Sequence, residues 1–196
     1  LAAEPAMILA HRPTLQEVTE VIPGEQSQLM MAFTSEVGYD NPGSLALFLL
    51  NGLYGAFAHS RLFRSVREEA GLAYVTGSSL DRSTGVLTAY AGLEAEAAAQ
   101  AGALMSEQMQ KLQEGDFSEA ELNMTIQTVA GQLRMSNQEA EGRLDYQFSR
   151  FLKGHGDVEQ MIEQLQSISR QEIITAAQTL KPHTVYLLAD REVTRE

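Results

Sequence analysis

The chain has 196 residues, a formal net charge of −12 and no cysteine. Its 26 acidic side chains outnumber 14 basic ones, which disfavours nucleic acid as a partner because phosphates require a basic surface. The lack of cysteine excludes disulfide bonds and thiolate metal sites. The longest apolar run, residues 44–58, is too short for a membrane span and is interrupted by Asn51, so we expect a soluble, cytoplasmic protein without a membrane partner.

The length fits one domain with a sizeable hydrophobic core. Residues 1–13, with Pro5 and Pro13 on either side of a short apolar run, are interpreted as an arm or linker. Residues 14–196 are interpreted as a single domain. Because the sequence begins with Leu1 rather than methionine, we expect this domain to be part of a longer chain.

The sequence of the first half of the domain predicts two strands and two helices. Residues 17–22 and 28–34 have strand character and are separated by a proline–glycine turn, which predicts a hairpin. Residues 44–54 are apolar on most sides and predict a buried helix. Residues 60–71 predict a second helix that a glycine ends, after which the chain enters a strand at Tyr74.

The second half predicts a strand pair, a helical run and a final strand. Residues 75–80 and 86–91 alternate loosely, as a half-exposed antiparallel pair would. Five predicted helices follow, and the second and fifth of them begin at capping boxes: residues 94–114, from Ser118 onward, 138–153, 158–165, and from Ser169 to Leu180. Residues 184–189 predict the closing strand. This order indicates an α+β fold of two layers, with one mostly antiparallel sheet and helices on one face.

The stretch from Ser60 to Tyr74 is the candidate binding element. Its apolar residues at helical spacing define a buried face, and Arg67 lies one turn beyond Phe63, at the border of that face. Tyr74 follows at the strand entry. A planar guanidinium and a phenol on one rim suit the binding of a peptide carbonyl or a developing oxyanion. On spacing alone the plainer interpretation is favoured, namely a surface arginine beside glutamates and a tyrosine packed on the sheet.

The same stretch resembles a family signature, carried by Gly55, Ser60-Arg61-Leu62-Phe63, Val66-Arg67-Glu68 and Gly71-Leu72-Ala73-Tyr74. It resembles the second, zinc-free domain of the pitrilysin/insulinase-type metallopeptidases, which include the mitochondrial processing peptidase and its bacterial relatives. A weaker resemblance in element order extends from about Val18 to about Asp190. The resemblance implies a metallopeptidase LuxS-like fold, with Arg67 and Tyr74 as substrate-binding residues that reach toward the zinc site of a partner domain.

The resemblance also implies a function and partners. The expected function is that of a substrate-binding, non-catalytic domain of a zinc-dependent metalloendopeptidase, forming one wall of a peptide-binding chamber. Zinc is expected in a partner domain or subunit, peptide is the expected substrate, and the sequence leaves a dimer and the activity of the assembly open. The alternative is a catalytically inert scaffold or interaction subunit of the same fold, which has no need of the Arg67 and Tyr74 pair. An unrelated α+β binding module is a weaker alternative, because it requires an accidental match.

The sequence predicts no metal site and no catalytic residue in this chain. None of His11, His59, His155 and His183 has glutamate at the third and histidine at the fourth following position, as the inverted zinc motif requires. The predicted helix at residues 44–54, which carries that motif in the zinc-bearing domains of the family, has no ligand. His155 lies between two glycines and is interpreted as a loop residue. His59 replaces a small residue of the motif and is interpreted as a helix-entry residue rather than a substrate contact.

Overall fold

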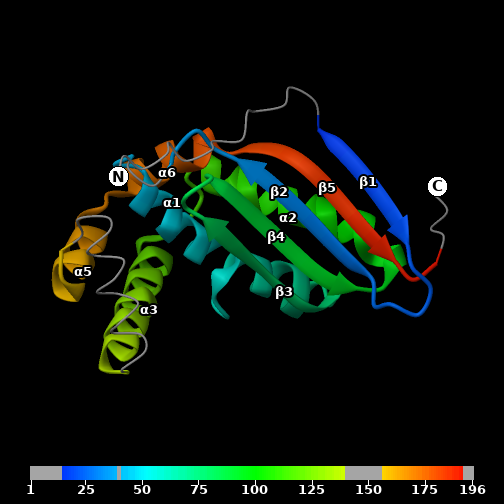
Figure 1. Cartoon of the computed structure of the whole chain (residues 1–196), viewed down its shortest axis with the longest axis horizontal. Helices are drawn as coiled ribbons and strands as arrows, with labels where there is room; N and C mark the ends of the chain where they lie inside the picture. The colour runs from blue at the N-terminus through cyan, green and yellow to red at the C-terminus, as the bar shows by residue number, and fades with distance from the viewer. Residues whose placement is uncertain (1–14, 39–40, 140–155, 192–196) are drawn as a thin grey trace, which may run out of the picture.

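The computed structural model describes residues 15–38, 41–139 and 156–191 (Figure 1). Within these ranges the strands form one sheet in the order β1-β5-β2-β4-β3. The strands are β1 (Gln16–Val21), β2 (Gln28–Thr34), β3 (Ala73–Asp81), β4 (Val86–Leu93) and β5 (Lys181–Ala189). Neighbouring strands are antiparallel except β1 and β5, which are parallel.

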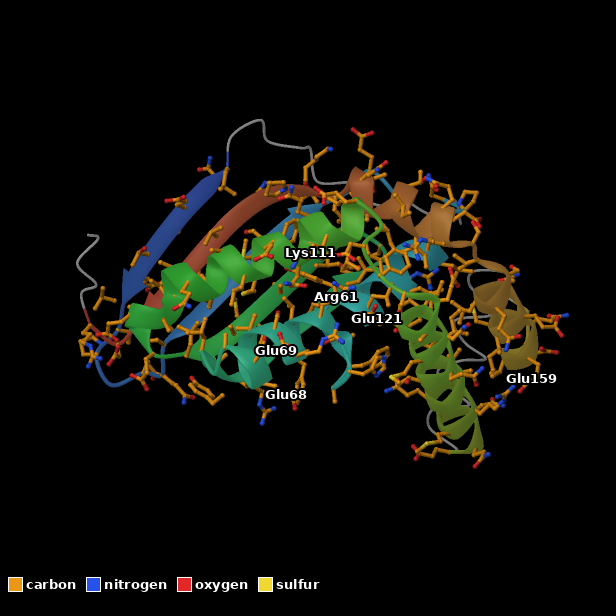
Figure 2. The ribbon with its side chains drawn as sticks, turned by 180° about the vertical axis from the view of Figure 1, so that it is seen from behind. Arg61, Glu68, Glu69, Lys111, Glu121 and Glu159 are labelled. Carbon is orange, nitrogen blue, oxygen red and sulfur yellow. The ribbon has the colours of Figure 1, made fainter. Side chains whose placement is uncertain are left out.

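Helices cover one face of this sheet, and the other face carries none of the described helices (Figures 1 and 2). They are α1 (Ser44–Asn51), η1 (Gly52–Ala56), η2 (Phe63–Glu69), η3 (Ala95–Ala97), α2 (Ala98–Gln113), α3 (Glu119–Gln138), α5 (Val158–Ser167) and α6 (Arg170–Thr179). The predicted α+β fold of two layers is therefore confirmed. The predicted arm at residues 1–13 lies outside the described residues, as does almost all of the predicted helix at residues 138–153.

The predicted hairpin between residues 17–22 and 28–34 is wrong. β5 lies between these two strands, and it pairs with β1 on one side and β2 on the other. The physical reason is that β5 contributes Val185 and Leu187 to the core next to Leu29 and Met31 of β2, whereas β1 is exposed along most of its length. Placing the more apolar strand in the middle buries more apolar surface.

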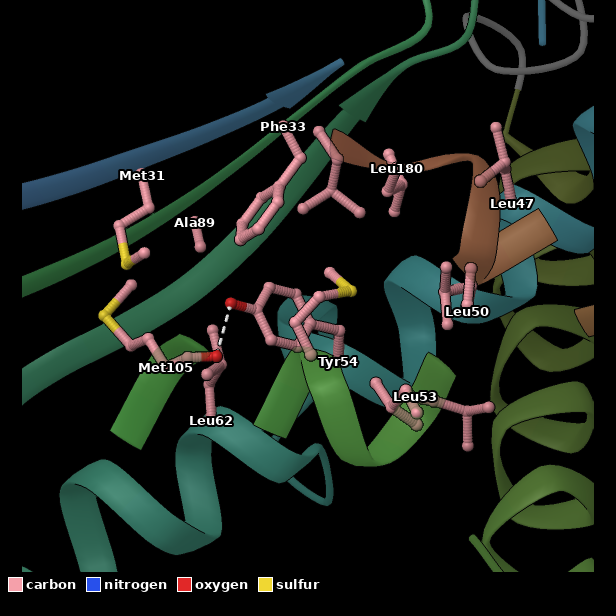
Figure 3. Packing of buried hydrophobic residues seen from close by; sticks show 14 of the residues in the cluster. Met31, Phe33, Leu47, Leu50, Leu53, Tyr54, Leu62, Ala89, Met105 and Leu180 are labelled. Atoms are coloured by element: carbon pink, nitrogen blue, oxygen red, sulfur yellow. Dashed lines mark hydrogen bonds between the residues drawn. The ribbon is translucent and has the colours of Figure 1, made fainter. Parts of the chain in front are cut away.

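The core fills the space between the sheet and the helices (Figure 3). Tyr54 at the centre is fully buried, and its hydroxyl donates a hydrogen bond of 3.0 Å to the carbonyl of Met105 in α2. The ring of Phe33 meets the ring of Tyr54 edge-on, with centroids 6.1 Å apart. Each such side chain contributes about 1.5–3 kcal/mol by burial, so this contact fixes β2, η1 and α2 against one another.

The helix that corresponds to residues 44–54 ends in a π-helical turn, η1, packed directly on β3. A Cβ atom built on Gly55 would lie 2.8 Å from the backbone nitrogen of Ser78, so only glycine fits here. The hydroxyl of Ser78 donates a bond of 2.7 Å to the Asn51 side chain at the same junction. Within the described ranges, none of the helices combines the length and apolar character that crossing a bilayer requires.

Candidate functional site

The residues of the sequence motif lie at the β3 edge of the sheet. η2 packs there through the buried side chain of Val66, and Leu72 donates its backbone N–H to the carbonyl of Val66 at 3.0 Å. Gly71, with φ of +63°, ends the helix as predicted and turns the chain into β3. β3 is the outermost strand of the described sheet on this side, so its outer edge has no strand partner there.

η2 is a π-helix rather than the α-helix that its spacing predicts. Ala70 donates to the carbonyl of Ser65, five residues earlier, and the hydroxyl of Ser65 donates to the carbonyl of Arg61 at 2.8 Å. This side-chain bond ties Ser65 back to the preceding turn of the helix. Short π-helical segments are frequent at functional sites, and this one carries Arg67.

Arg67 is exposed on η2, and its guanidinium lies over the ring of Phe63, 4.8 Å from the ring centroid. This cation–π contact restricts the side chain without using its N–H donors. Glu68 and Glu69 follow on the same helix and are also exposed (Figure 2). The guanidinium is thus held at the surface with its donors turned to solvent or to a ligand.

Tyr74 lies on the helix-free face of the sheet. A β-bulge between Ala73 and Val75 turns both Tyr74 and Val75 to this face, where each is 42% exposed. The Tyr74 ring covers Gly92 of β4, and its hydroxyl donates a long bond of 3.4 Å to the carbonyl of Ser27. Burial, and secondarily the carboxylate of Glu94, raises the pKa of Tyr74. The phenol is therefore a neutral hydrogen-bond donor at physiological pH.

The structure brings Arg67 and Tyr74 to the same edge of the sheet but not into contact. Arg67 lies on η2, which belongs to the helix layer, whereas the ring of Tyr74 lies on the opposite, helix-free face. In the described part of the chain no hydrogen bond joins the two side chains. The prediction that the two groups share one rim is therefore wrong: they lie on opposite faces of the sheet, and the phenol of Tyr74 extends over β4 toward Ser27 rather than toward the outer edge of β3.

The other two arginines of the stretch from Ser60 to Tyr74 bind Glu121, a residue that the sequence did not single out for this contact. Arg61 Nε and Arg64 Nη2 each lie 3.0 Å from Glu121 Oε1, and Glu121 also closes the capping box of α3 with Ser118. Burial raises the pKa of Glu121, but the bonds from Ser118 and the two guanidinium groups outweigh it and lower the pKa to about 2. This cluster anchors the motif helix to the start of α3.

His59 also connects the motif to α3. Its ring stacks on Phe57, with centroids 5.4 Å apart, and its Nε2 lies 3.2 Å from Thr125 Oγ1. Burial lowers the pKa of His59. These contacts agree with its interpretation as a helix-entry residue. His155 lies outside the described residues.

The metal-binding side chains of the described ranges do not gather. No group of three or more His, Asp or Glu side chains placed to hold a metal ion occurs there. His183, for example, lies with its Nδ1 2.7 Å from the hydroxyl of Thr184.

Comparison with known proteins identifies the family. A family model described as "Peptidase M16 inactive domain" matches residues 3–129, which include Gly55, Arg67 and Tyr74. The chain belongs to this family. The resemblance inferred from the motif is confirmed at the level of the zinc-free domain, while the finer likeness to the mitochondrial processing peptidase stays a prediction.

Individual similar proteins show how much of a relative's length the chain represents. It is 28% identical over 178 residues to the "Probable inactive metalloprotease YmfF" of Bacillus subtilis, covering 90% of this chain and 42% of that protein. A crystal structure of a conserved protein from Enterococcus faecalis V583 matches with a TM-score of 0.87 and 26% identity, over 94% of this chain and 44% of that one. The M16 inactive domain from Pseudomonas fluorescens shares the fold, with a TM-score of 0.70 at 17% identity, over 93% of this chain and 45% of that one. The chain spans less than half the length of each of these relatives.

Proposed function

We propose that this M16 inactive domain binds substrate for a zinc-dependent metalloendopeptidase and forms one wall of its peptide-binding chamber. A partner domain or subunit of the same family supplies the zinc and the groups that cleave the peptide. The observation that carries the proposal is the family match over the motif, together with the exposure of its two hydrogen-bond donors, Arg67 and Tyr74.

A free strand edge is suited to an extended peptide, which adds to the sheet as a further strand. A peptide on the outer edge of β3 passes Arg67 on η2, and it reaches the phenol of Tyr74, which lies over β4, where it continues onto the helix-free face. The guanidinium of Arg67 then donates to a peptide carbonyl, and the phenol of Tyr74 donates to the oxyanion that develops during cleavage. The 3.4 Å bond from Tyr74 to Ser27 is long and is readily exchanged for a bond to substrate.

The charges near the site indicate the kind of peptide that it favours. Glu68 and Glu69 are next to Arg67 in the helix, and Glu94 is close enough to Tyr74 to act on its pKa. The whole chain carries a net charge of −12. Long-range attraction therefore favours peptides with basic side chains.

The test is peptide hydrolysis by the assembly of this chain with its zinc-bearing partner. Arg67→Lys and Tyr74→Phe should each lower kcat/KM on the order of a hundredfold, because lysine lacks the planar fork of the guanidinium and phenylalanine lacks the hydroxyl that donates in the transition state. The matched control is Arg134→Lys, at an exposed ion pair with Glu159. Unchanged kcat/KM in both Arg67→Lys and Tyr74→Phe would remove the proposal.

A second candidate is a scaffold without peptidase activity, which the name of the B. subtilis relative, "Probable inactive metalloprotease", favours. In a scaffold, Arg67 and Tyr74 have no substrate to hold. Metal analysis of the purified assembly separates the two candidates. A stoichiometric zinc ion together with peptide hydrolysis supports the peptidase, and their joint absence supports the scaffold.

A further inference from the structure

The residue that accepts the hydrogen bond of the Tyr74 hydroxyl is itself held in place by a neighbouring strand. Ser27 directly precedes β2, at the end of the sheet where β2 begins and β4 and β5 end (Figure 1). Its carbonyl accepts a hydrogen bond of 3.1 Å from the backbone N–H of Leu93, and the Tyr74 hydroxyl donates to the same carbonyl at 3.4 Å. A carbonyl oxygen has two lone pairs, so it accepts both bonds at once. The phenol is therefore directed at a carbonyl that β4 already holds.

The side chain of Ser27 ties the same residue to Asp190, which directly follows β5. Its hydroxyl donates to Asp190 Oδ1 at 3.0 Å and accepts the backbone N–H of Asp190 at 3.1 Å. Ser27 is only 3% exposed, so these two bonds satisfy a hydroxyl that water does not reach. Because the bonds form a closed pair, they restrict both the rotation of the side chain and the position of the Ser27 backbone. The carbonyl that faces Tyr74 is thus fixed from β4 and from β5.

The ring of Tyr74 rests on the same part of the sheet. It covers Gly92, which precedes Leu93 in β4 and pairs with Gln28, the residue that follows Ser27. The surface beneath the ring and the acceptor of its hydroxyl therefore belong to adjacent positions of the β2–β4 pair. Tyr74 is 42% exposed, so the side of the ring that faces away from Gly92 stays open. A donor held in this way is oriented before substrate arrives.

We propose that Ser27 and Asp190 are positioning residues for Tyr74, because their paired side chains fix the carbonyl to which the phenol donates when no substrate is bound. The inference rests on the proposed function, in which this phenol donates to the oxyanion. A neutral bond of 3.4 Å is weaker than a charge-assisted bond to an oxyanion, so substrate displaces the Ser27 carbonyl while the ring stays over Gly92. Ser27 and Asp190 themselves need not touch the substrate.

The kinetics of the assembled peptidase distinguish positioning from a role in stability alone. Ser27→Ala removes both bonds to Asp190 and should lower kcat about tenfold with little change in KM, because a misplaced phenol weakens a contact made in the transition state. In a chain that already carries Tyr74→Phe, Ser27→Ala should cause no further loss, since both changes act through one hydroxyl. An equal loss in the two backgrounds would overturn the inference, because the pair would then act only on the fold.

Asp190 provides a second set of variants, which keeps the test valid if Ser27→Ala loosens the buried site. Asp190→Ala removes the acceptor and should reproduce the loss of kcat, whereas Asp190→Asn keeps a side-chain oxygen that accepts the Ser27 hydroxyl and should retain most of the activity. Normal kcat in Asp190→Ala would contradict the inference. The matched control is Ser83→Ala, which breaks the pair of Ser83 with Asp81 at the opposite end of β3 and should leave kcat and KM unchanged.

A measurement on the chain alone separates failure of this inference from failure of the proposed function. With fluorotyrosine in place of tyrosine, the fluorine NMR signal of Tyr74 is assigned by its loss in Tyr74→Phe. Donating a hydrogen bond favours the neutral phenol, so Ser27→Ala and Asp190→Ala should lower the pKa of Tyr74, and Asp190→Asn should not. An unchanged signal and pKa in both alanine variants would overturn the inference. A lowered pKa combined with full turnover by Tyr74→Phe would support the positioning and remove the substrate role instead.

Discussion

Tyr74 and Gly92 stand on neighbouring strands, and the ring of Tyr74 covers the glycine so closely that a Cβ atom built there would lie 2.6 Å from Cε2 of the ring. The position of the phenol therefore depends on a residue in another strand that has no side chain. The bulge between Ala73 and Val75 turns the Tyr74 ring to the helix-free face, and the missing side chain of Gly92 leaves room for the ring there. Any side chain at position 92 must move Tyr74 or Val75.

Gly92→Ala should displace the phenol of Tyr74. We expect kcat/KM of the assembled peptidase to fall at least about tenfold, because small misplacements of a group that contacts the transition state are costly. Combining Gly92→Ala with Tyr74→Phe should produce no further loss beyond that of Tyr74→Phe, since both act through the same hydroxyl. Kinetics of the two single variants and the double variant provide the measurement.

Gly131→Ala in α3 is the matched control, because nothing lies within 4 Å of a Cβ atom built there. It should leave kcat/KM unchanged and stabilise the chain by up to about 1 kcal/mol, as alanine does in a helix interior. Fully additive losses in the double variant would show that Gly92 acts other than through Tyr74.

Gly55→Ala should destabilise the fold by about 2–3 kcal/mol, because the new methyl group meets the backbone of Ser78, which cannot rotate away as a side chain can. Urea denaturation of the chain provides the measurement. Gly102→Ala in α2, whose Cβ atom would lie at an ordinary 3.4 Å from Leu29, serves as the control and should not lose stability. Equal stability of the two variants would contradict the close packing of η1 on β3.

The elements of the fold were predictable from local patterns. The capping boxes at Ser118 and Ser169 mark helix starts that the structure confirms, and the strand character of residues 28–34 marks a strand that it also confirms. The pairing of β1 was not predictable, because the strand is exposed on most of its length and its sequence does not specify which neighbour it takes. Its partner β5 is more than 160 residues away in the chain.

The site was only partly predictable. The motif located Arg67 and Tyr74, but a bulge changes the alternation of side chains by one residue, so the sequence could not say which face Tyr74 takes. The π-helix at η2 was missed because its apolar residues also satisfy α-helical spacing. The contact of Arg61 with Glu121 was missed because it joins elements that only the tertiary fold brings together.

Tyr54→Phe should cost about 1 kcal/mol of stability. The substitution keeps the buried ring but leaves the carbonyl of Met105 without the hydrogen bond that the phenol donates at 3.0 Å. Thermal or urea denaturation measures the loss. Tyr90→Phe, at an exposed ring, should be neutral, and a Tyr54→Phe chain as stable as the unmodified one would show that this bond adds nothing to the core.

Glu121→Gln should lower the free energy of unfolding by about 2 kcal/mol at pH 7, because it removes the charge that binds Arg61 and Arg64. The pKa of Glu121 lies at about 2 in the folded protein, below its ordinary value of 4.5. A carboxyl whose pKa is lowered by folding stabilises the folded state at pH values above its pKa in the unfolded chain. That stabilisation is lost as the pH falls through its pKa in the folded protein. The stability difference between the unmodified chain and Glu121→Gln should therefore be constant above about pH 5 and should narrow toward pH 2.

Urea denaturation across this pH range checks the expectation, with Glu159→Gln as the control. Glu159 pairs with Arg134 at an exposed position on α5, where solvent screens the ion pair. Its replacement should change stability too little to resolve at any pH. A Glu121→Gln difference that stays the same between pH 7 and pH 3 would mean that the lost stability comes from packing or from the capping box rather than from the charge. The motif helix would then be anchored to α3 without the ion pair, and Arg61 and Arg64 would be free for other contacts.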